Sequence, residues 1–322
     1  MLRPGDRIGE YTISEFLGRG GFSQVYKAGD PDGTPVILKI PDISVLGDLA
    51  TFARFRREAA IRQSLDHPAI PRVIAVNEGA DTISLVLEYV EGTSFRTYIS
   101  GHAPLPLDQV LSFTGQLADV LDYIHSHGVY HRDLKPENII VGTDGRIHLL
   151  DFGTALQEGS WRVTWRWGSY AVGTVDYMAP EQIQGKRGDS RTDLYALGMI
   201  VYEMLTGTLP FTGDNTFSIM NQHLTAVPIP PGRFQPSVPP GIEAVVLRSI
   251  CRDPALRYQS AGAFRYDMEH SAELDLSQFH AEPVAGGSLT GRRVWLRRIS
   301  IFIASLAVAT LLFMVVYLIE HR

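Results

Sequence analysis

Two short segments that lie close together constrain this chain more than any other feature of its sequence. The first is the run HRDLKPEN at residues 131–138, and the second is the triplet DFG at residues 151–153. The residues between them place apolar side chains on both sides of a TDG turn signal, which predicts a short hairpin. Eight specified residues beside a matching triplet are very improbable by chance, so these two segments carry the interpretation.

Four side chains of these segments form a chemically coherent set. Asp133 and Lys135 supply a carboxylate and an ammonium group, and Asn138 and Asp151 supply oxygen atoms. In-line phosphoryl transfer needs a carboxylate at the acceptor hydroxyl, a cation near the moving phosphate and oxygen ligands for magnesium. The pattern therefore favours a phosphoryl-transfer site over a structural loop.

Two features upstream fit the same chemistry, although each is weak alone. The stretch GRGGFSQV at residues 18–25 lies between predicted strands, where glycines let backbone amides approach phosphate oxygens. A bare structural turn is at least as common, and a dinucleotide-binding fold would need a helix here, whereas residues 25–28 look extended. Lys39 ends the next strand and Glu58 lies on the helix predicted for residues 49–65, so the two could form the ion pair that orients a lysine among phosphates.

Local signals place the elements around these motifs. The run PDGT at residues 31–34 predicts a hairpin turn. Asp108 is a plausible N-cap for a helix with an apolar stripe, which Gly128 would close. A strongly apolar helix is expected at residues 193–205.

With these motifs in this order, the chain resembles the eukaryotic-type protein kinases and is most similar to the bacterial membrane-anchored Ser/Thr protein kinases. The resemblance covers about residues 11–272 and includes the motifs APE at 179–181 and DLYALG at 193–198. It implies an α+β, bilobal fold with a small β-rich N-lobe and a larger helical C-lobe. We assign residues 1–90 to the N-lobe and residues 91–274 to the C-lobe.

The resemblance carries functional residues over position by position. It implies that Asp133 is the catalytic base and that Lys135 lies beside the γ-phosphate of ATP. It implies that Asn138 and Asp151 hold Mg²⁺, with Mn²⁺ as an alternative. Residues implied to bind ATP are the loop residues Leu17, Gly18, Arg19, Gly20, Gly21, Phe22, Ser23, Gln24 and Val25, then Lys39, and the hinge residues Glu88 and Val90 after the gatekeeper position Leu87. Residues implied to be structural are Glu58 as the partner of Lys39, Glu181 as the partner of Arg257, and Asp193 beneath the catalytic loop.

The sequence departs from the family pattern at two uncharged positions. Ser23 stands where a third glycine is common, and it still permits a tight turn. Ile37 replaces an alanine that the family packs against adenine, so it either tightens or crowds the pocket. Neither change removes a charged group that the chemistry needs.

The resemblance also implies which hydroxyl groups accept the phosphoryl group and which residues of the activation segment are phosphorylated. Lysine two residues after the base is the Ser/Thr pattern, and Gly173-Thr174 before APE agrees with it. In the family, the arginine at the position of Arg132 often contacts a phosphorylated loop, so we expect autophosphorylation at Thr164 or Ser169, and less so at Ser160. The tryptophans of that loop either pack on one another or form a docking surface for a partner kinase or a membrane; they are Trp161, Trp165 and Trp167.

The C-terminal end differs from the rest of the chain. Residues 299–319 carry no charged side chain, and a helix of that length rises roughly 31 Å, enough to cross a bilayer. A buried core helix is the less favoured alternative. Four arginines precede this segment, which by the positive-inside tendency keeps the lobes cytoplasmic. We therefore expect a single-pass cell-membrane protein with a juxtamembrane linker at 275–298 and a short external tail at 320–322.

Overall charge and cysteine content bear on the partners of the chain and on its cellular compartment. A net charge of −6 with a sequence pI of about 5.9 argues against a nucleic-acid partner. The single cysteine, Cys251, cannot form an internal disulfide, which is typical of a cytosolic domain.

The sequence thus predicts an ATP-dependent protein serine/threonine kinase that transfers the γ-phosphoryl group to protein Ser/Thr hydroxyls, autophosphorylates and acts in membrane-anchored signalling. Its expected partners are ATP, protein substrates, the lipid bilayer and a second copy for phosphorylation in trans. Two alternatives stay open, a non-catalytic kinase-fold scaffold and a small-molecule phosphotransferase. The retained Lys39, Asp133 and Asp151 argue against the first, and the APE motif with Glu181 and Arg257 argues against the second.

Overall fold

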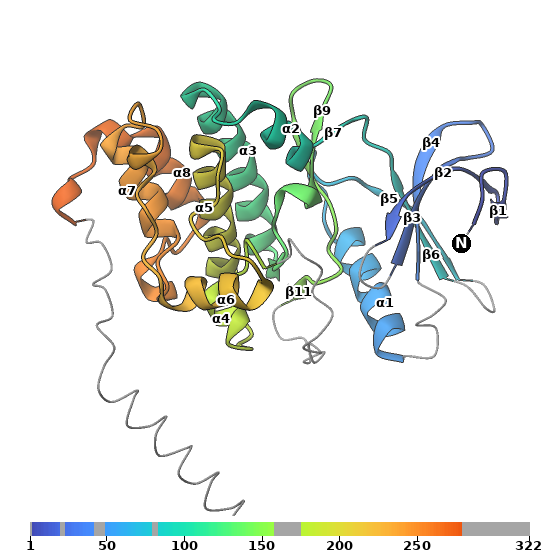
Figure 1. Cartoon of the computed structure of the whole chain (residues 1–322). Coiled ribbons are helices and arrows are strands. Elements are labelled where there is room, and N and C mark those ends of the chain that lie inside the picture. Colours follow the sequence, from blue (N-terminus) through green and yellow to red (C-terminus); the bar gives the residue numbers. More distant parts are fainter. Residues whose placement is uncertain (1, 20–22, 42–48, 79–82, 158–174, 279–322) are drawn as a thin grey trace, which may run out of the picture. The chain divides into compact units, whose positions relative to one another are not determined.

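The computed structural model describes residues 2–19, 23–41, 49–78, 83–157 and 175–278. The chain divides into two compact units, Met1–Ala281 and Glu282–Arg322. The second unit lies outside the described residues, so every helix and strand named below belongs to the first (Figure 1).

The N-lobe is built on a six-stranded antiparallel sheet with the strand order β1-β2-β3-β4-β6-β5 (Figure 1). Its strands are β1 (Arg7–Ile8), β2 (Tyr11–Arg19), β3 (Ser23–Gly29), β4 (Pro35–Pro41), β5 (Val73–Glu78) and β6 (Ile83–Glu88). The hairpin predicted at PDGT joins β3 to β4. Asp30 Oδ1 accepts hydrogen bonds from the backbone N–H of Asp32 and Thr34 there, and Gly33 takes the left-handed φ of 83° that favours glycine.

The two faces of this sheet bury different side chains because successive strand residues point to opposite sides. One face carries a cluster that includes Tyr11, Tyr26 and Leu38. The other face packs Leu85 and Leu87 against the helix α1 (Leu49–Gln63), which contributes Phe55 and Ala59. The helix predicted at residues 49–65 therefore turns Phe55 and Ala59 toward the sheet, and the buried Glu58 lies between them in the sequence.

The C-lobe is mainly helical and surrounds a large core. Its helices are α2 (Phe95–His102), α3 (Leu107–Ser126), α4 (Pro180–Ile183), α5 (Ser190–Thr206), α6 (Thr216–Thr225), α7 (Pro240–Ser249) and α8 (Ala261–Glu269), with short 3₁₀ helices η2 (Pro136–Asn138), η3 (Pro231–Arg233), η4 (Pro254–Leu256), η5 (Ser271–Glu273) and η6 (Leu276–Gln278). Every residue of α5 from Thr192 to Leu205 is buried. The bilobal α+β fold predicted from the sequence is confirmed.

Helix ends show where local sequence signals succeed and where one fails. Asp189 caps α5, because its side chain accepts from the backbone N–H of Arg191 at 3.0 Å. The prediction that Asp108 caps α3 is wrong: the helix begins at Leu107, two residues earlier than that cap implies, and no side chain of the described residues caps it. Asp108 lies in the first turn instead, where its negative charge still complements the positive end of the helix. Gly128, predicted to close this helix, follows its C-terminal end with a φ of 68°.

Short strands bring the two signature segments of the C-lobe together. β9 (Ile139–Gly142) and β10 (Ile147–Leu149) form the predicted hairpin, and β7 (Gly92–Ser94) pairs with β9. β8 (Val129–Tyr130) pairs with β11 (Leu156–Gln157) on the other side. The backbone N–H of Leu150 donates to the carbonyl of Asn138 at 2.7 Å, so residues 131–138 and 151–153 lie side by side.

No helix within the described ranges is both long and apolar enough to cross a membrane. The transmembrane helix predicted at residues 299–319 lies outside the described residues, as does most of the predicted linker at 275–298.

Candidate active site

Lys39, Glu58 and Asp151 meet at one point although they come from three segments. The ammonium group of Lys39, on β4, donates to both carboxylate oxygens of Glu58 at 2.6 and 2.7 Å. It also donates to Oδ1 of Asp151 at 2.8 Å. Lys39 and Glu58 are buried, whereas the side chain of Asp151 remains 40% exposed. The ion pair expected for an aligned triphosphate site is therefore formed, and it extends to the DFG aspartate.

Asp151 is held in an uncommon backbone conformation by its neighbours. Its φ is 50°, in the left-handed region that non-glycine residues rarely adopt. Its Oδ1 accepts from the backbone N–H of Gly153 at 3.0 Å. A Cβ at Gly153 would lie 3.0 Å from Asp151 Oδ1 and 3.2 Å from Glu58 Oε2, so a side chain there would press on both carboxylates. This close approach explains the glycine of the DFG triplet.

Phe152 holds the same segment in place through buried ring contacts. It is 1% exposed and packs edge-on against the ring of His131, with the ring centroids 5.1 Å apart. The guanidinium of Arg62, on α1, lies 4.9 Å from the Phe152 ring centroid. Arg62 also donates from Nε to Glu58 Oε1 at 3.4 Å, so α1 and the DFG segment share one buried contact.

Asp133, Lys135 and Asn138 form a second group in the same loop. Lys135 donates to the two carboxylate oxygens of Asp133 at 3.1 and 2.9 Å. Asn138 donates from Nδ2 to the backbone carbonyl of Asp133 at 2.7 Å and to its Oδ2 at 3.1 Å. These bonds point the amide nitrogen of Asn138 toward Asp133 and leave its Oδ1 as the atom that could bind a cation.

Asp193 anchors this catalytic loop from beneath. Its Oδ2 accepts from the backbone N–H of His131 at 2.9 Å, and its Oδ1 accepts from that of Arg132 at 2.7 Å. His125 Nε2 lies 2.8 Å from Oδ2. Asp193 is completely buried, and these contacts hold its pKa below the ordinary value although burial alone would raise that pKa. The position predicted for a loop-steadying aspartate thus makes the contacts that such a role needs.

Neighbouring charges decide the ionisation of the central groups. Burial alone would lower the pKa of Lys39, but the carboxylates of Asp151 and Glu58 raise it above its usual value. Burial alone would raise the pKa of Asp151, yet Lys39 holds it well below the usual range. For Asp133, burial raises the pKa and Lys135 offsets this only in part. Asp133 is therefore more basic than an ordinary carboxylate, which suits a group that accepts a proton.

The available oxygen atoms fit a magnesium ion. Magnesium keeps several waters and is usually bound by one or two side-chain oxygens together with phosphate oxygens. Oδ2 of Asp151 has no hydrogen-bond partner among the described residues, and Asn138 offers Oδ1. No group of three or more His, Cys, Asp or Glu side chains in the described part of the chain could hold a metal by protein ligands alone. The site therefore fits a metal that arrives with phosphate.

The predicted nucleotide-covering loop is described only in part. Leu17, Gly18 and Arg19 end β2, and Ser23, Gln24 and Val25 begin β3, whereas Gly20, Gly21 and Phe22 lie outside the described residues. A Cβ at Gly18 would meet nothing within 4 Å, so this glycine leaves open space beside the strand.

The predicted hinge follows the end of β6. The backbone N–H of Glu88 donates to the carbonyl of Arg72 at 2.9 Å, so this N–H is already occupied, and an adenine would have to meet other backbone groups of the segment that ends at Val90. Ile37 packs against the cluster of Leu85, Leu87 and Phe55.

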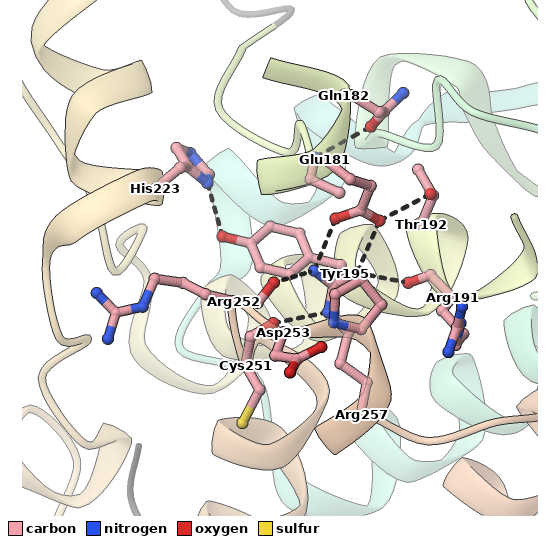
Figure 2. A network of polar contacts seen from close by, with 12 residues as sticks. Glu181, Gln182, Arg191, Thr192, Tyr195, His223, Cys251, Arg252, Asp253 and Arg257 are labelled. Atoms are coloured by element: carbon pink, nitrogen blue, oxygen red, sulfur yellow. Dashed lines mark hydrogen bonds and ion pairs between the residues drawn. The ribbon is translucent and has the colours of Figure 1, made fainter. Parts of the chain in front are cut away.

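The end of the activation segment is fixed by a buried ion pair (Figure 2). Arg257 donates to both oxygens of Glu181 at 2.9 and 2.8 Å, and Thr192 donates to Glu181 Oε1 at 2.8 Å. The pairing of Glu181 with Arg257 that the sequence suggested is present. The candidate phosphorylation sites Thr164, Ser169 and Ser160, the loop tryptophans and Gly173-Thr174 lie outside the described residues.

Sequence reasoning missed two arginines that connect these parts. Arg62 lies four residues after Glu58, so the helical spacing of the pair was a signal in the sequence. Arg96, on α2, donates to Glu137 at 2.7 Å, to Glu203 at 2.6 Å and to the hydroxyl of Tyr177. These partners are far from Arg96 in the sequence, and no local sequence pattern predicts the contacts.

Comparison with known proteins gives a consistent result. Residues 11–266 match the family model described as protein kinase domain. A probable serine/threonine-protein kinase of Streptomyces coelicolor is 38% identical over 275 residues, which covers 84% of this chain and 41% of that protein. The serine/threonine-protein kinases PrkC of Bacillus subtilis and PknB of Mycobacterium tuberculosis are 36% and 34% identical, over 84% and 83% of this chain and 42% and 44% of their own lengths. The chain thus spans less than half the length of these curated relatives.

A solved structure agrees in fold. The crystal structure of the PknI kinase domain of Mycobacterium tuberculosis superposes with a TM-score of 0.65 at 26% identity, covering 84% of this chain and 99% of that one.

Proposed function

This chain belongs to the protein kinase family, and we propose from that premise that it is an ATP-dependent serine/threonine kinase that transfers the γ-phosphoryl group of ATP to protein hydroxyls. The observation that carries the proposal is the contact of Lys39 with both Glu58 and Asp151, at distances of 2.6 to 2.8 Å. In protein kinases this lysine–glutamate pair and the DFG aspartate must both be in place for transfer. Here they are joined while Asp133 and Asn138 lie in the adjoining loop.

Each residue has a defined task in this proposal. Lys39 orients the α- and β-phosphates and is itself oriented by Glu58. Asp133 positions the acceptor hydroxyl and finally accepts its proton, with Lys135 beside the γ-phosphate. Asn138 and Asp151 would hold magnesium, which neutralises phosphate charge when bound. Because little covalent chemistry falls to the protein, positioning and electrostatic stabilisation should supply most of the rate.

Lys135 supports serine or threonine as the acceptor. It lies two residues after the proposed base and donates to the base carboxylate at 2.9 Å, which supports a role beside the transferred phosphoryl group. The relatives described above are named serine/threonine-protein kinases, which points the same way.

We test the proposal with Asp133→Asn. Loss of a general base typically costs about 10²- to 10⁴-fold in turnover, so transfer of radiolabel from γ-labelled ATP to an acceptor protein should fall by that order. Asp144→Asn is the matched control, because Asp144 lies on the exposed turn between β9 and β10 and should leave transfer unchanged. Wild-type protein that transfers no label, or equal rates for Asp133→Asn and wild type, would refute the proposal.

The proposal also includes attachment to the cell membrane. The uncharged segment 299–319, preceded by four arginines, supports a single-pass anchor with the catalytic lobes in the cytoplasm. Anchoring raises the local concentration of neighbouring copies, so autophosphorylation in trans within a homodimer is part of the same proposal.

A further inference from the structure

Gln182 connects the end of the activation segment with the backbone just before the proposed base. It lies on α4, directly after Glu181 (Figure 2). Its Oε1 accepts from the backbone N–H of Ala179 at 3.0 Å, and its Nε2 donates to the backbone carbonyl of Arg132 at 2.8 Å. Since a backbone N–H only donates and a carbonyl only accepts, both ends of the side-chain amide are fixed in orientation.

The carbonyl that Gln182 holds belongs to a residue in an unusual conformation. Arg132 has a φ of 65°, in the left-handed region that a non-glycine residue keeps only when its surroundings impose it. On one side of Arg132, its backbone N–H is bound by Asp193 Oδ1 at 2.7 Å. On the other side, its carbonyl is bound by Gln182 at 2.8 Å. Two side chains from different elements thus fix the peptide groups before and after this residue.

A cavity of about 10 Å³ lies beside this peptide group, lined in part by Arg132, Asp133, Gln182, Thr192 and Asp193. The hydrogen bond from Gln182 therefore acts on a peptide group that is not enclosed by side chains on every side.

We propose that Gln182 is a positioning residue for phosphoryl transfer: through the carbonyl of Arg132 it sets the direction in which Asp133 faces the acceptor hydroxyl. The carbonyl carbon of Arg132 is bonded to the backbone nitrogen of Asp133. A tilt of this peptide plane therefore turns the Asp133 side chain. The Oε1 bond to Ala179 ties this alignment to the placement of the segment that precedes α4. The inference rests on the proposed kinase activity.

Two substitutions separate this role from simple capping of α4. Gln182→Glu keeps an oxygen acceptor for the Ala179 N–H but replaces the donor to Arg132 with a second oxygen. Gln182→Met removes both bonds at similar size. Gln222→Glu is the matched control: Gln222, on α6, also donates from Nε2 to a backbone carbonyl, that of Thr212, but away from the catalytic loop.

The measurements are made on the full chain with a serine- and threonine-containing acceptor protein. They are kcat, KM for ATP and thermal unfolding, with kcat normalised to the number of nucleotide-binding sites so that unfolded protein does not count. We expect Gln182→Glu and Gln182→Met to lower kcat about 10- to 100-fold, since small misplacements of reacting groups cost this much. KM for ATP should stay within about 2-fold, because ground-state nucleotide binding does not use the bond. Gln222→Glu should match wild type.

Three outcomes would overturn the inference. Near-normal kcat for Gln182→Glu with a deficit only in Gln182→Met would assign Gln182 to capping alone. Normal kcat in both variants would remove any role in transfer. A rise in KM for ATP at unchanged kcat would assign the residue to nucleotide binding. An inactive wild-type protein in the same assay would instead refute the proposed function, so the two failures are distinguishable.

Discussion

Lys39 and His223 illustrate how neighbours decide the charge of a buried residue. Lys39 is 7% exposed, and carboxylates from α1 and the DFG segment keep it protonated. His223, on α6, is fully buried and shares a hydrogen bond of 2.7 Å with the hydroxyl of Tyr195 (Figure 2). Its Nε2 has no partner in the described part of the chain. Burial disfavours the charged imidazolium, and no carboxylate in the described part of the chain offsets this. The pKa of His223 therefore falls to about 4.

This lowered pKa predicts a stability change in mildly acidic solution. The unfolded chain binds a proton at His223 below the ordinary histidine pKa of 6.5, whereas the folded chain resists protonation down to about pH 4. The stabilisation is therefore complete above pH 6.5 and is lost as the pH falls toward 4. The shift corresponds to about 3 kcal/mol of the free energy of unfolding. Chemical denaturation of wild type and His223→Asn at several pH values measures it, and the variant should show the shallower dependence.

A partly exposed histidine provides the control. His270 lies at the end of α8 with its ring stacked on Tyr266, and His270→Asn should keep the pH dependence of wild type. If His223→Asn also kept it, then burial of His223 would not be its cause.

Single residues differ in how far the sequence reveals them. Asp151 was predicted because it belongs to the DFG triplet, and Lys39 and Glu58 were predicted because the family resemblance pairs them. Gln182 and Arg96 were not, since they act on backbone or side-chain groups many positions away, and their side chains carry no local pattern. Contacts that depend on tertiary structure rather than on the spacing of residues in the sequence cannot be predicted in this way.

At the scale of elements, Arg257 joins three parts of the C-lobe. Beside its two bonds to Glu181 of α4, it donates to the carbonyls of Cys251, Arg252 and Arg191 at 2.6, 2.9 and 3.0 Å (Figure 2). A guanidinium has five N–H donors, and these contacts use all of them. The arginine therefore satisfies a buried carboxylate and three carbonyls at once.

Removing Arg257 should cost more than neutralising its partner. Arg257→Met leaves Glu181 charged and buried, and breaking a buried pair in this way costs about 3 to 5 kcal/mol. Glu181→Gln leaves the buried guanidinium without a carboxylate, but it keeps an oxygen for Thr192 and the three carbonyl contacts of Arg257, so its loss should be smaller. Urea unfolding of both variants gives the comparison, and equal losses, or a greater loss for Glu181→Gln, would contradict it.

The elements themselves were largely predictable, and the error at Asp108 shows the limit. Hydrophobic periodicity revealed α1 and α3, which turn an apolar face to the core, and α5 was revealed by its strongly apolar sequence, because it is buried on all sides. The start of α3 depended on Pro106, whose fixed φ suits the residue before a helix and competes with a capping side chain shortly after it.

At the scale of the whole molecule, the proposed anchor should control the rate of autophosphorylation. The predicted C-lobe ends at Leu274, and the proposed span begins at residue 299. In liposomes, the full chain should float with lipid and autophosphorylate faster than a truncation ending at Leu274 at equal bulk concentration, because confinement to a surface raises local concentration. Flotation and time courses of label incorporation measure the two effects.

A tethering control separates concentration from any other influence of the C-terminal segment. The truncated protein, attached through a C-terminal histidine tag to nickel-bearing lipids at matched density, should regain the faster rate. A truncation that floats without a tag, or a full chain that gains nothing from liposomes, would end the anchoring proposal.

The charges around Lys39 and Lys135 also bear on how a nucleotide can bind. Three cations, from Lys39, Arg62 and Lys135, face three carboxylates, from Glu58, Asp133 and Asp151. This set of six groups is thus formally neutral and offers no surplus positive charge to a polyanion. Triphosphate affinity should accordingly depend on the divalent ion carried in with it, and nucleotide without that ion should bind poorly even though every motif residue is intact.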